Sequence, residues 1–308
     1  MTGLLLIDKP EGLTSFGALM RVKRIISQKK CGHTGTLDPM ATGVLTVLLG
    51  GATRFSELLP DHNKAYIAKL RLGTVTDTLD ITGKVLEENP VTATKEDFIA
   101  SLAPFRGEIS QLPPMYSAVS VNGKRLYELA REGKEVERTP RTVFISELEL
   151  ISADEDKNEY EIRVGCSSGT YIRTLADDIG RALGCGATLV SLRRTLANSF
   201  TAEQTLTLEE LEQAVADGRL EEYILPLDKA LEYYPAVTVS EKQAVRFLNG
   251  GALALERLGS MGERIAENPG YYRVYSPDGV FLGLGEAQEE ELKVKRVNPD
   301  AQNREANK

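Results

Sequence analysis

The start of the chain changes from a strand-like to a helix-like spacing of apolar side chains. Residues 2–7 form a short apolar run that ends in the turn-forming stretch 8–12, a pattern typical of a strand followed by a turn. Thr14 or Ser15 is a suitable cap for the helix that follows. Its apolar positions recur at helical spacing: Phe16, Leu19, Val22, Ile25 and Ile26. We therefore expect these side chains to form the apolar face of the helix.

The middle of the chain holds further strand signals. Residues 44–49 form an apolar run that predicts a buried strand, and residues 64–72 alternate as a half-buried strand does. Residues 143–152 and 160–166 predict two strands of a hairpin that are joined by a charged loop. A helix is predicted from residue 171 to about residue 183. The pattern as a whole mixes strands and helices.

Two segments differ from this pattern. Residues 113–141 look like an excursion from the core, because an Asn122-Gly123 turn signal is combined with a short polar helix and several basic residues. The character of the chain also changes near residue 235. This change predicts a division into residues 1–235 and a smaller, mostly β domain of residues 236–308. The polar tail after Val297 is expected to fray.

Composition excludes several classes of protein. No apolar run approaches the roughly 18 residues of a membrane-spanning helix, and the N-terminus lacks the basic start of a signal peptide. Cys31, Cys166 and Cys185 are odd in number and far apart, so we expect no disulfide framework and a cytoplasmic protein. His33 and His62 are too few for a multi-histidine metal site. Nucleotide-binding glycine motifs are absent as well. An enzyme with this sequence is expected to need neither metal nor cofactor.

The charge of the chain is unevenly distributed. Its net value of −8 argues at first against a nucleic-acid-binding protein. However, residues 201–308 hold 12 basic and 20 acidic side chains, whereas residues 1–200 hold 25 of each. The first 64 residues hold 8 basic and 5 acidic side chains, a local excess of +3. The start of the chain thus has the sign of charge that a nucleic-acid surface needs.

The segment with the densest chemistry is residues 32–45, Gly-His-Thr-Gly-Thr-Leu-Asp-Pro-Met-Ala-Thr-Gly-Val-Leu. Its glycines and its proline predict a tight loop before a buried strand. Asp38 precedes Pro39, which favours an extended backbone and a fixed position for the carboxylate. On loop composition alone, a residue that only caps or turns the chain is the better explanation.

This segment and the blocks around it resemble the TruB family of tRNA pseudouridine synthases. The upstream block is Leu-Ile-Asp-Lys-Pro-Glu-Gly-Leu-Thr-Ser at 6–15, and later blocks include Pro-Pro-Met-Tyr-Ser-Ala at 113–118 and Ser-Gly-Thr-Tyr-Ile-Arg at 168–173. The blocks follow the family's order over residues 1–200. The resemblance implies an α+β fold with a mixed, mainly antiparallel central sheet flanked by helices. It also implies a small C-terminal PUA-like domain that binds RNA, although the match is loose there.

The resemblance further implies that the chain isomerises uridine to pseudouridine at position 55 in the T loop of tRNA. The uracil leaves C1′ through N1 and returns through C5. Asp38 is the nucleophile in this interpretation, since a carboxylate is ionised at neutral pH and captures an electron-poor sugar carbon, as in retaining glycosidases. The target base must be flipped from its stack at a cost of a few kcal/mol. Attack at C1′, attack at C6 and initial loss of the C2′ proton all remain open.

Three further residues match the family's active site. Tyr66 matches a tyrosine that lies against the target base, where stacking contributes about 1–3 kcal/mol, and its phenol can also accept a proton. Arg173 matches the arginine that pairs with the catalytic aspartate and keeps it ionised. Leu192 matches an apolar wall of the uracil pocket. Without the resemblance, these residues would be an ordinary strand aromatic, a helix-surface arginine and a core leucine.

Five residues complete the implied set of substrate contacts: His33, Tyr171, Lys9, Lys29 and Lys30. The resemblance implies that His33 contacts the RNA and helps to hold the everted nucleotide. Lys9 belongs to a motif that braces the catalytic loop. For Lys29 and Lys30, a merely solvated position is an equally good explanation, and a lone histidine is more often structural than functional.

The implied partner is tRNA, which the chain binds as a monomer without a guide RNA, a cofactor, a metal or a membrane. In this interpretation residues 113–141 close over the RNA stem-loop. A second interpretation is a tRNA-binding folding helper with the same fold, but the intact set of Asp38, Tyr66 and Arg173 argues against lost catalysis. A third is a guide-RNA-dependent relative. Such a protein would carry basic extensions, which the short acidic tail disfavours.

Overall fold

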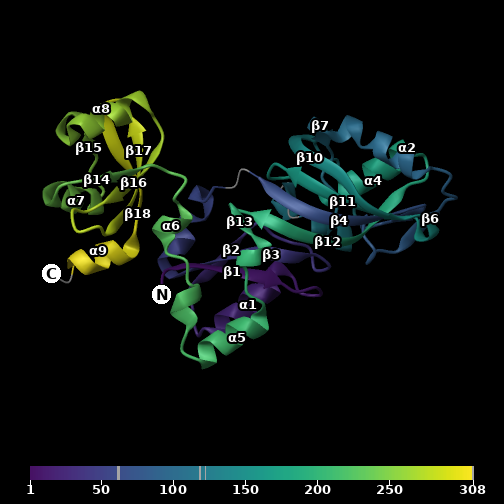
Figure 1. Cartoon of the computed structure of the whole chain (residues 1–308), viewed down its shortest axis with the longest axis horizontal. Helices are drawn as coiled ribbons and strands as arrows, with labels where there is room; N and C mark the ends of the chain where they lie inside the picture. Colours follow the sequence, from purple (N-terminus) through teal and green to yellow (C-terminus); the bar gives the residue numbers. More distant parts are fainter. Residues whose placement is uncertain (61–62, 118, 122, 307–308) are drawn as a thin grey trace.

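The computed structural model describes most of the chain, namely residues 1–60, 63–117, 119–121 and 123–306. His62 and Asn122, which the sequence analysis singled out, lie outside the described residues. Figure 1 shows a large sheet with helices beside it and a smaller, mostly β unit at one end of the molecule. None of the helices in the described ranges is both long and apolar enough to cross a membrane.

The large sheet contains nine strands within the described part of the chain. These are β1 (Gly3–Lys9), β2 (Cys31–Thr34), β3 (Thr42–Leu49), β4 (Lys64–Leu72), β7 (Gly107–Gln111), β10 (Arg141–Asp154), β11 (Glu159–Cys166), β12 (Ala187–Ala197) and β13 (Phe200–Thr201). Their main order is β1-β3-β12-β4-β11-β10-β7, with β2 on β3 and β13 on β12. β3 and β12 run parallel, and the other described neighbours run antiparallel. The predicted mixed, mainly antiparallel sheet is confirmed, as is the β10–β11 hairpin.

Helices cover this sheet because their apolar stripes face it. These helices are α1 (Ser15–Ile25), α2 (Lys95–Ser101), α4 (Ile172–Ala182), α5 (Leu208–Ala216) and α6 (Leu227–Ala230), whereas α3 (Leu126–Arg131) lies outside the sheet. Helix α4, which the sequence predicted, buries Ile172, Leu175 and Ile179 in the main core. Short 3-10 turns connect the elements at η1 (Gly50–Leu58), η2 (Ala103–Phe105), η3 (Glu155–Lys157), η4 (Ala202–Gln204), η5 (Leu220–Tyr223) and η6 (Leu255–Leu258).

The predicted apolar face of α1 is wrong at one position. Phe16 is 63% exposed, whereas Leu19 and Val22 are buried. The reason lies in the first turn, where the buried Ser15 side chain is turned inward and hydrogen bonded to the main chain of Leu37. The buried stripe therefore starts at Ser15, and the next residue along the helix points outward.

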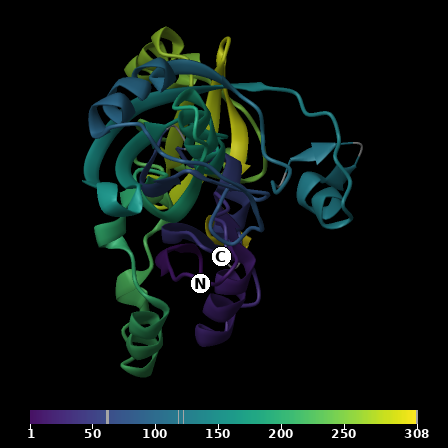
Figure 2. The same cartoon turned by 90° about the vertical axis from the view of Figure 1, so that its right-hand side faces the viewer.

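Two small hairpins extend from the sheet. One consists of β5 (Thr74–Thr76) and β6 (Val85–Glu88), and the other of β8 (Ser120–Val121) and β9 (Lys124–Arg125) followed by α3. Figure 2 shows the second hairpin and its helix projecting away from the body of the molecule. The short helix predicted in the excursion is α3.

The C-terminal unit is a five-stranded sheet with three helices among its described residues. Its elements are β14 (Ala236–Thr238), α7 (Glu241–Leu248), β15 (Leu253–Ala254), α8 (Ser260–Glu267), β16 (Tyr271–Tyr275), β17 (Phe281–Gln288), β18 (Glu291–Val297) and α9 (Pro299–Ala306). The mostly β character is confirmed. The expected fraying after Val297 is wrong, because the tail forms α9. Ala301 of α9 is 3% exposed in the core of this unit, and the Asn298 amide nitrogen donates to the main-chain oxygen of Phe281 at 2.9 Å.

One apolar cluster includes side chains from both units. It contains Leu4 and Phe55 from the first unit and Phe281 and Leu284 from the second. The Phe55 and Phe281 rings are 6.3 Å apart between centroids. The division at residue 235 stays a prediction, and the apolar core continues across it.

Candidate active site

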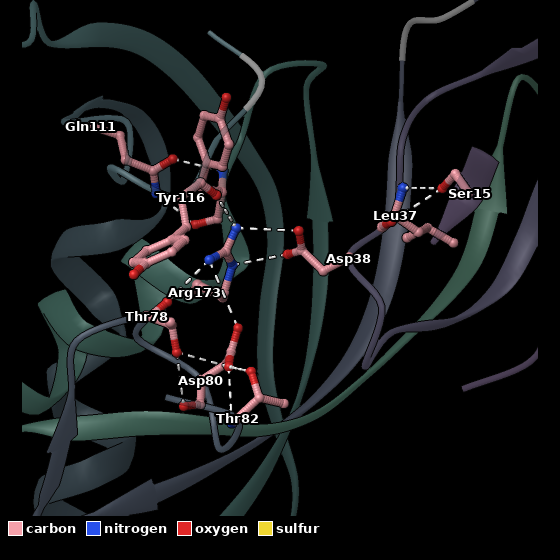
Figure 3. A network of polar contacts seen from close by, with 10 residues as sticks. Ser15, Leu37, Asp38, Thr78, Asp80, Thr82, Gln111, Tyr116 and Arg173 are labelled. Atoms are coloured by element: carbon pink, nitrogen blue, oxygen red, sulfur yellow. Dashed lines mark hydrogen bonds and ion pairs between the residues drawn. The ribbon is translucent and has the colours of Figure 1, made fainter. Parts of the chain in front are cut away.

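Asp38 lies on the loop between β2 and β3, and this loop is anchored on both sides of it. The Ser15 hydroxyl accepts from the Leu37 amide at 2.7 Å and donates to the Leu37 carbonyl at 3.1 Å (Figure 3). The Ala41 amide donates to the Asp38 carbonyl at 3.1 Å. The Leu37 and Met40 side chains are buried in the main core. The backbone of Asp38 is thus held firmly, while 35% of its side chain remains exposed.

Arg173, in the first turn of α4, holds the Asp38 carboxylate with two prongs of its guanidinium. Nε lies 2.9 Å from Oδ2, and Nη2 donates to Oδ1 at 3.2 Å (Figure 3). The same guanidinium donates to the carbonyls of Tyr116 at 2.7 Å and Thr78 at 3.0 Å. Its side chain is only 5% exposed. Because arginine does not lose its proton, this fork favours the ionised form of Asp38.

Asp80 forms the far end of this charged network and was missed by sequence reasoning. One carboxylate oxygen lies 3.8 Å from Nη1 of Arg173. The other accepts from the Thr78 hydroxyl at 2.9 Å and from the amide and hydroxyl of Thr82 at 3.0 and 2.6 Å (Figure 3). An Asp between two threonines was a signal for such a turn. Asp80 therefore fixes the loop whose carbonyl holds Arg173.

Opposing effects act on the protonation of Asp38. Burial among protein atoms raises the pKa of Asp38 above its usual value, and the charge of Arg173 opposes this increase. The Asp80 charge raises the pKa of Asp38 further, whereas the Lys9 charge lowers it. The site thus contains a partly buried carboxylate that titrates at higher pH than a free aspartate, while nearby cations favour its ionised form.

Tyr66 and Leu192 lie on the sheet face that packs against the Asp38 loop. In the antiparallel β4–β12 pair, Tyr66 is opposite Arg194 and Ala68 is opposite Leu192. Side chains two residues apart on a strand share a face, so these four residues face the same side. Tyr66 is 6% and Leu192 is 7% exposed, and both belong to the core cluster that contains Leu37 of the loop. The fold therefore brings the predicted base-contacting residues together with Asp38.

His33 is half-buried on β2, opposite Val47 of β3. Burial lowers the pKa of His33, and the nearby charge of Arg194 lowers it further. Nδ1 of His33 has no hydrogen-bond partner in the described part of the chain. The imidazole is therefore uncharged near neutral pH and retains a free hydrogen-bonding nitrogen.

Lys9 was expected among the substrate-binding residues, and this expectation is wrong. Its side chain is completely buried, and Nζ donates to the carbonyls of Pro10 at 2.8 Å, Leu13 at 2.6 Å and Pro39 at 3.3 Å. Burial lowers the pKa of Lys9 to about 8, although Asp38 raises it. The contacts of Lys9 therefore support the other role expected for its motif, which is to brace the Asp38 loop.

The remaining predicted contacts differ in position. Lys29 and Lys30 are exposed on the turn before β2, whereas Asp38 follows the other end of that strand. Tyr171 lies just before α4, where Gln111 holds its main chain. The Gln111 amide oxygen accepts from the Tyr171 amide at 2.7 Å, and its nitrogen donates to the Tyr171 carbonyl at 3.0 Å. Sequence reasoning missed Gln111, which is 2% exposed and sets the start of the helix that carries Arg173.

Comparison with known proteins gives the class of protein to which this fold and site belong, the pseudouridine synthases, because a family model of pseudouridylate synthases matches residues 23–172. The chain superposes over 96% of its length on Cbf5 in the crystal structure of a Cbf5-Nop10-Gar1 complex, with a TM-score of 0.72, 28% sequence identity and 84% of that chain covered. A structure of an H/ACA RNP bound to a substrate RNA containing 2′-deoxyuridine matches with a TM-score of 0.71, 26% identity and the same shares.

Sequence comparison identifies the family within this class. Family models match as the TruB family pseudouridylate synthase N-terminal domain at 23–172, the tRNA pseudouridylate synthase B C-terminal domain at 173–232, and the pseudouridine synthase II TruB C-terminal domain at 235–297. tRNA pseudouridine synthase B of Azoarcus sp. strain BH72 is 47% identical over 298 residues, which cover 96% of this chain and 94% of the relative. That of Stutzerimonas stutzeri strain A1501 is 45% identical over 295 residues, covering 94% and 93%. The chain belongs to the TruB family.

Proposed function

We propose that this protein isomerises uridine to pseudouridine at position 55 in the T loop of tRNA. The observation that carries the proposal is the Asp38 carboxylate, one third exposed and held in the fork of the buried Arg173 side chain. The family relatives, which are tRNA pseudouridine synthases by name, support tRNA as the substrate. A uridine in a T loop must leave its stack to reach Asp38, as other modified bases do.

The reaction is an isomerisation whose atoms balance within the nucleotide. The bond between C1′ and N1 breaks, the uracil turns, and C5 bonds to C1′. The proton of C5 is lost to a base, and N1 gains a proton. Asp38 acts as the nucleophile that assists cleavage of the bond between C1′ and N1. Arg173 keeps the Asp38 carboxylate ionised and aligned. No oxidant, water or cofactor enters this balance.

The neighbouring side chains have separate roles in this proposal. Tyr66 lies against the target base and can accept a proton, while Leu192 forms an apolar wall of the uracil pocket. His33 contacts the everted nucleotide as an uncharged imidazole. Tyr171 contacts the substrate from its position directly before α4. Lys29 and Lys30 attract RNA phosphates.

The projecting segment 113–141 is the part that closes over the RNA stem-loop in this proposal (Figure 2). It carries six basic side chains, which phosphates attract: Lys124, Arg125, Arg131, Lys134, Arg138 and Arg141. Residues 236–308 add an RNA-binding PUA-like domain. We infer that a monomer of this chain acts in the cytoplasm on tRNA alone, without a guide RNA.

The experiment is to incubate the purified chain with an unmodified tRNA transcript, with no other RNA and no cofactor, and to map pseudouridine by sequencing. One pseudouridine at position 55 is expected, and Asp38→Asn should abolish it. Full activity of Asp38→Asn would disprove the assignment of the nucleophile. A requirement for an added RNA would instead indicate guide-dependent action.

A folding-helper role is separable in the same variant. If Asp38→Asn forms no pseudouridine but still binds tRNA and restores the structure of misfolded tRNA, the chain has a helper activity in addition to catalysis. If the variant binds but does not restore misfolded tRNA, catalysis is the activity that the fold serves.

A further inference from the structure

Arg194 of β12 is buried in an unusual way for a charged side chain. It is 1% exposed and is the largest of the fully buried side chains in the described ranges. Its Nε and Nη2 donate to the Val44 carbonyl at 2.8 and 2.5 Å, and Nη2 also donates to the Gly35 carbonyl at 2.8 Å. Within the described part of the chain, no carboxylate forms an ion pair with it. Burying a cation without a counter-charge is costly, so a compensating benefit is expected.

The two carbonyls that Arg194 holds are the two ends of the Asp38 loop. Gly35 follows β2 directly, and Val44 is the third residue of β3, so the guanidinium joins the chain before Asp38 to the chain after it. Arg194 itself sits on a central strand, opposite Tyr66 of β4 on one side and Gly43 of β3 on the other. The loop ends are therefore tied to a strand in the middle of the sheet.

Two glycines let the loop approach Arg194 this closely. A Cβ atom on Gly43 would lie 2.1 Å from the main-chain oxygen of Arg194, and one on Gly35 would lie 3.2 Å from its Nη1. Both glycines have positive φ angles, 99° and 64°. On its other side, Gly43 is opposite Lys9 of β1. The base of the loop thus lies between two buried cations.

We propose that Arg194 is a positioning residue for the reaction: it clasps both ends of the Asp38 loop and places a permanent positive charge behind the catalytic site. The proposal rests on the proposed function, in which Asp38 is the nucleophile. Arg173 touches Asp38 directly, whereas Arg194 acts through the main chain on either side of it. A lysine carries the same charge but lacks the planar guanidinium whose Nε and Nη2 together fix the contacts to Val44 and Gly35, so it cannot hold them in the same geometry.

The charge of Arg194 has its own consequence at the neighbouring His33. After burial, it is the second cause that lowers the pKa of His33, and it also lowers the pKa of Lys9. Arg194 therefore helps to keep an uncharged imidazole beside the RNA. The hold on the Asp38 loop and the positive charge are two effects that substitutions can separate. Arg194→Lys disturbs the hold and retains the charge, whereas Arg194→Met removes both.

The kinetic test measures single-turnover pseudouridine formation and tRNA affinity for Arg194→Lys, Arg194→Met and Arg193→Met. Arg193 is the matched control, because it is the neighbouring cation on β12 but is 41% exposed and pairs with Asp8 at 2.7 Å. We expect both Arg194 variants to lose about 100-fold in rate, the usual effect of a misplaced catalytic group, with tRNA affinity within about twofold. Arg193→Met should stay within about tenfold. A wild-type rate in Arg194→Lys would overturn the positioning role.

The second test is an NMR titration of His33 in the free protein, which needs no activity. The chain has only two histidines, so His62→Gln assigns the signals. The His33 pKa should rise in Arg194→Met and stay unchanged in Arg194→Lys and Arg193→Met. An unchanged pKa in Arg194→Met would overturn the role of the charge. If Arg194→Met does not fold, the rate of Arg194→Lys alone decides the positioning role. A wild-type chain that is inactive on tRNA would instead refute the proposed function.

Discussion

At the scale of single residues, the site is a line of alternating charges, Asp38, Arg173 and Asp80, that is exposed only at its Asp38 end. Asp38 keeps 35% of its side chain exposed, whereas Arg173 and Asp80 keep 5% and 6%. The exposed end can meet a substrate, and the buried end resists movement because its remaining hydrogen bonds are satisfied within the protein. Arg173 therefore both orients Asp38 and controls its protonation.

The first prediction concerns the pH dependence of activity. The reactive form of Asp38 is the carboxylate, so activity falls as pH drops through its pKa. Burial raises that pKa and Arg173 opposes the increase, so Arg173→Gln should raise it further and move the acidic limb of the rate profile to higher pH. Single-turnover rates on a tRNA transcript from pH 5 to pH 8 measure the shift. Arg181→Gln on the same helix, 68% exposed, is the control and should leave the limb in place. An unmoved limb in Arg173→Gln would contradict the role assigned to that charge.

The second prediction concerns the pH dependence of stability that arises from Lys9. Its pKa is lowered from 10.5 to about 8, so between these pH values the folded protein has released a proton that the unfolded chain still binds. The free energy of unfolding therefore rises with pH in this window, by up to about 1.4 kcal/mol per pH unit from this group. Lys9→Met should show a correspondingly smaller slope in urea unfolding between pH 8 and pH 10.5. The exposed Lys242→Met is the control, and equal slopes in Lys9→Met and wild type would show that Lys9 is not perturbed.

The family motifs in the sequence propose residues for the chemistry, and they leave out residues that position them. Asp38, Tyr66 and Arg173 lie in short motifs, so a single segment identifies each one. Gln111 acts through hydrogen bonds to the main chain of Tyr171, in a distant segment, and such contacts leave no pattern in the sequence around it. Asp80 lies in a local threonine-containing turn, but its ion pair with Arg173 joins segments that are far apart in the chain. Positioning residues of this kind require the assembled fold to be recognised.

At the scale of elements, no strand was predicted over the residues of β12, which supports the site. β12 carries Arg193 and Arg194 in succession, which resembles a basic surface segment rather than the centre of a sheet. The structure separates the pair: Arg193 reaches out to Asp8, and Arg194 turns into the core toward the loop. The prediction for helix α1 was wrong at an apolar residue instead. Phe16 fits the apolar spacing and was predicted to be buried, but it is exposed because Ser15 takes the inward position. Tertiary contacts decided both cases.

The third prediction tests the basic turn between α1 and β2. If Lys29 and Lys30 each contact a phosphate, Lys29→Gln/Lys30→Gln should reduce the slope of log affinity against log salt by about 1.4–1.8, from roughly 0.7–0.9 per contact. Titrations of tRNA at four or more salt concentrations measure the slope. The matched control is Lys95→Gln/Lys157→Gln, which removes two exposed lysines from other elements. A slope equal to that of the control would assign Lys29 and Lys30 to solvent.

At the scale of the whole molecule, charge and packing divide the chain differently. The acidic excess lies after residue 200, so the net charge of −8 does not describe the N-terminal surface next to Asp38. The apolar cluster around Leu4, Phe55 and Phe281, in contrast, joins the two units. The Thr2 hydroxyl also donates to the carboxylate of Asp300 at 3.1 Å, which ties the first residues of the chain to α9. The C-terminal unit, in which residues 236–308 hold 10 basic and 11 acidic side chains, is thereby fixed beside the first unit, and most of the acidic excess belongs to residues 201–235.

The fourth prediction follows from this shared core. Phe281 is 7% exposed and packs against Phe55 of the first unit and Tyr275 of its own, with ring centroids 6.3 and 5.6 Å apart. Because the cluster belongs to both units, unfolding one exposes apolar surface of the other, and the wild type should melt in one calorimetric transition. Phe281→Ala should lower that transition as a whole, at a cost of about 3–5 kcal/mol. Val245→Ala on α7, 43% exposed, is the control and should change little. Two transitions in the wild type, with only one of them lowered by Phe281→Ala, would mean that the units fold independently. In that case this core would not set the orientation of the C-terminal sheet toward bound RNA.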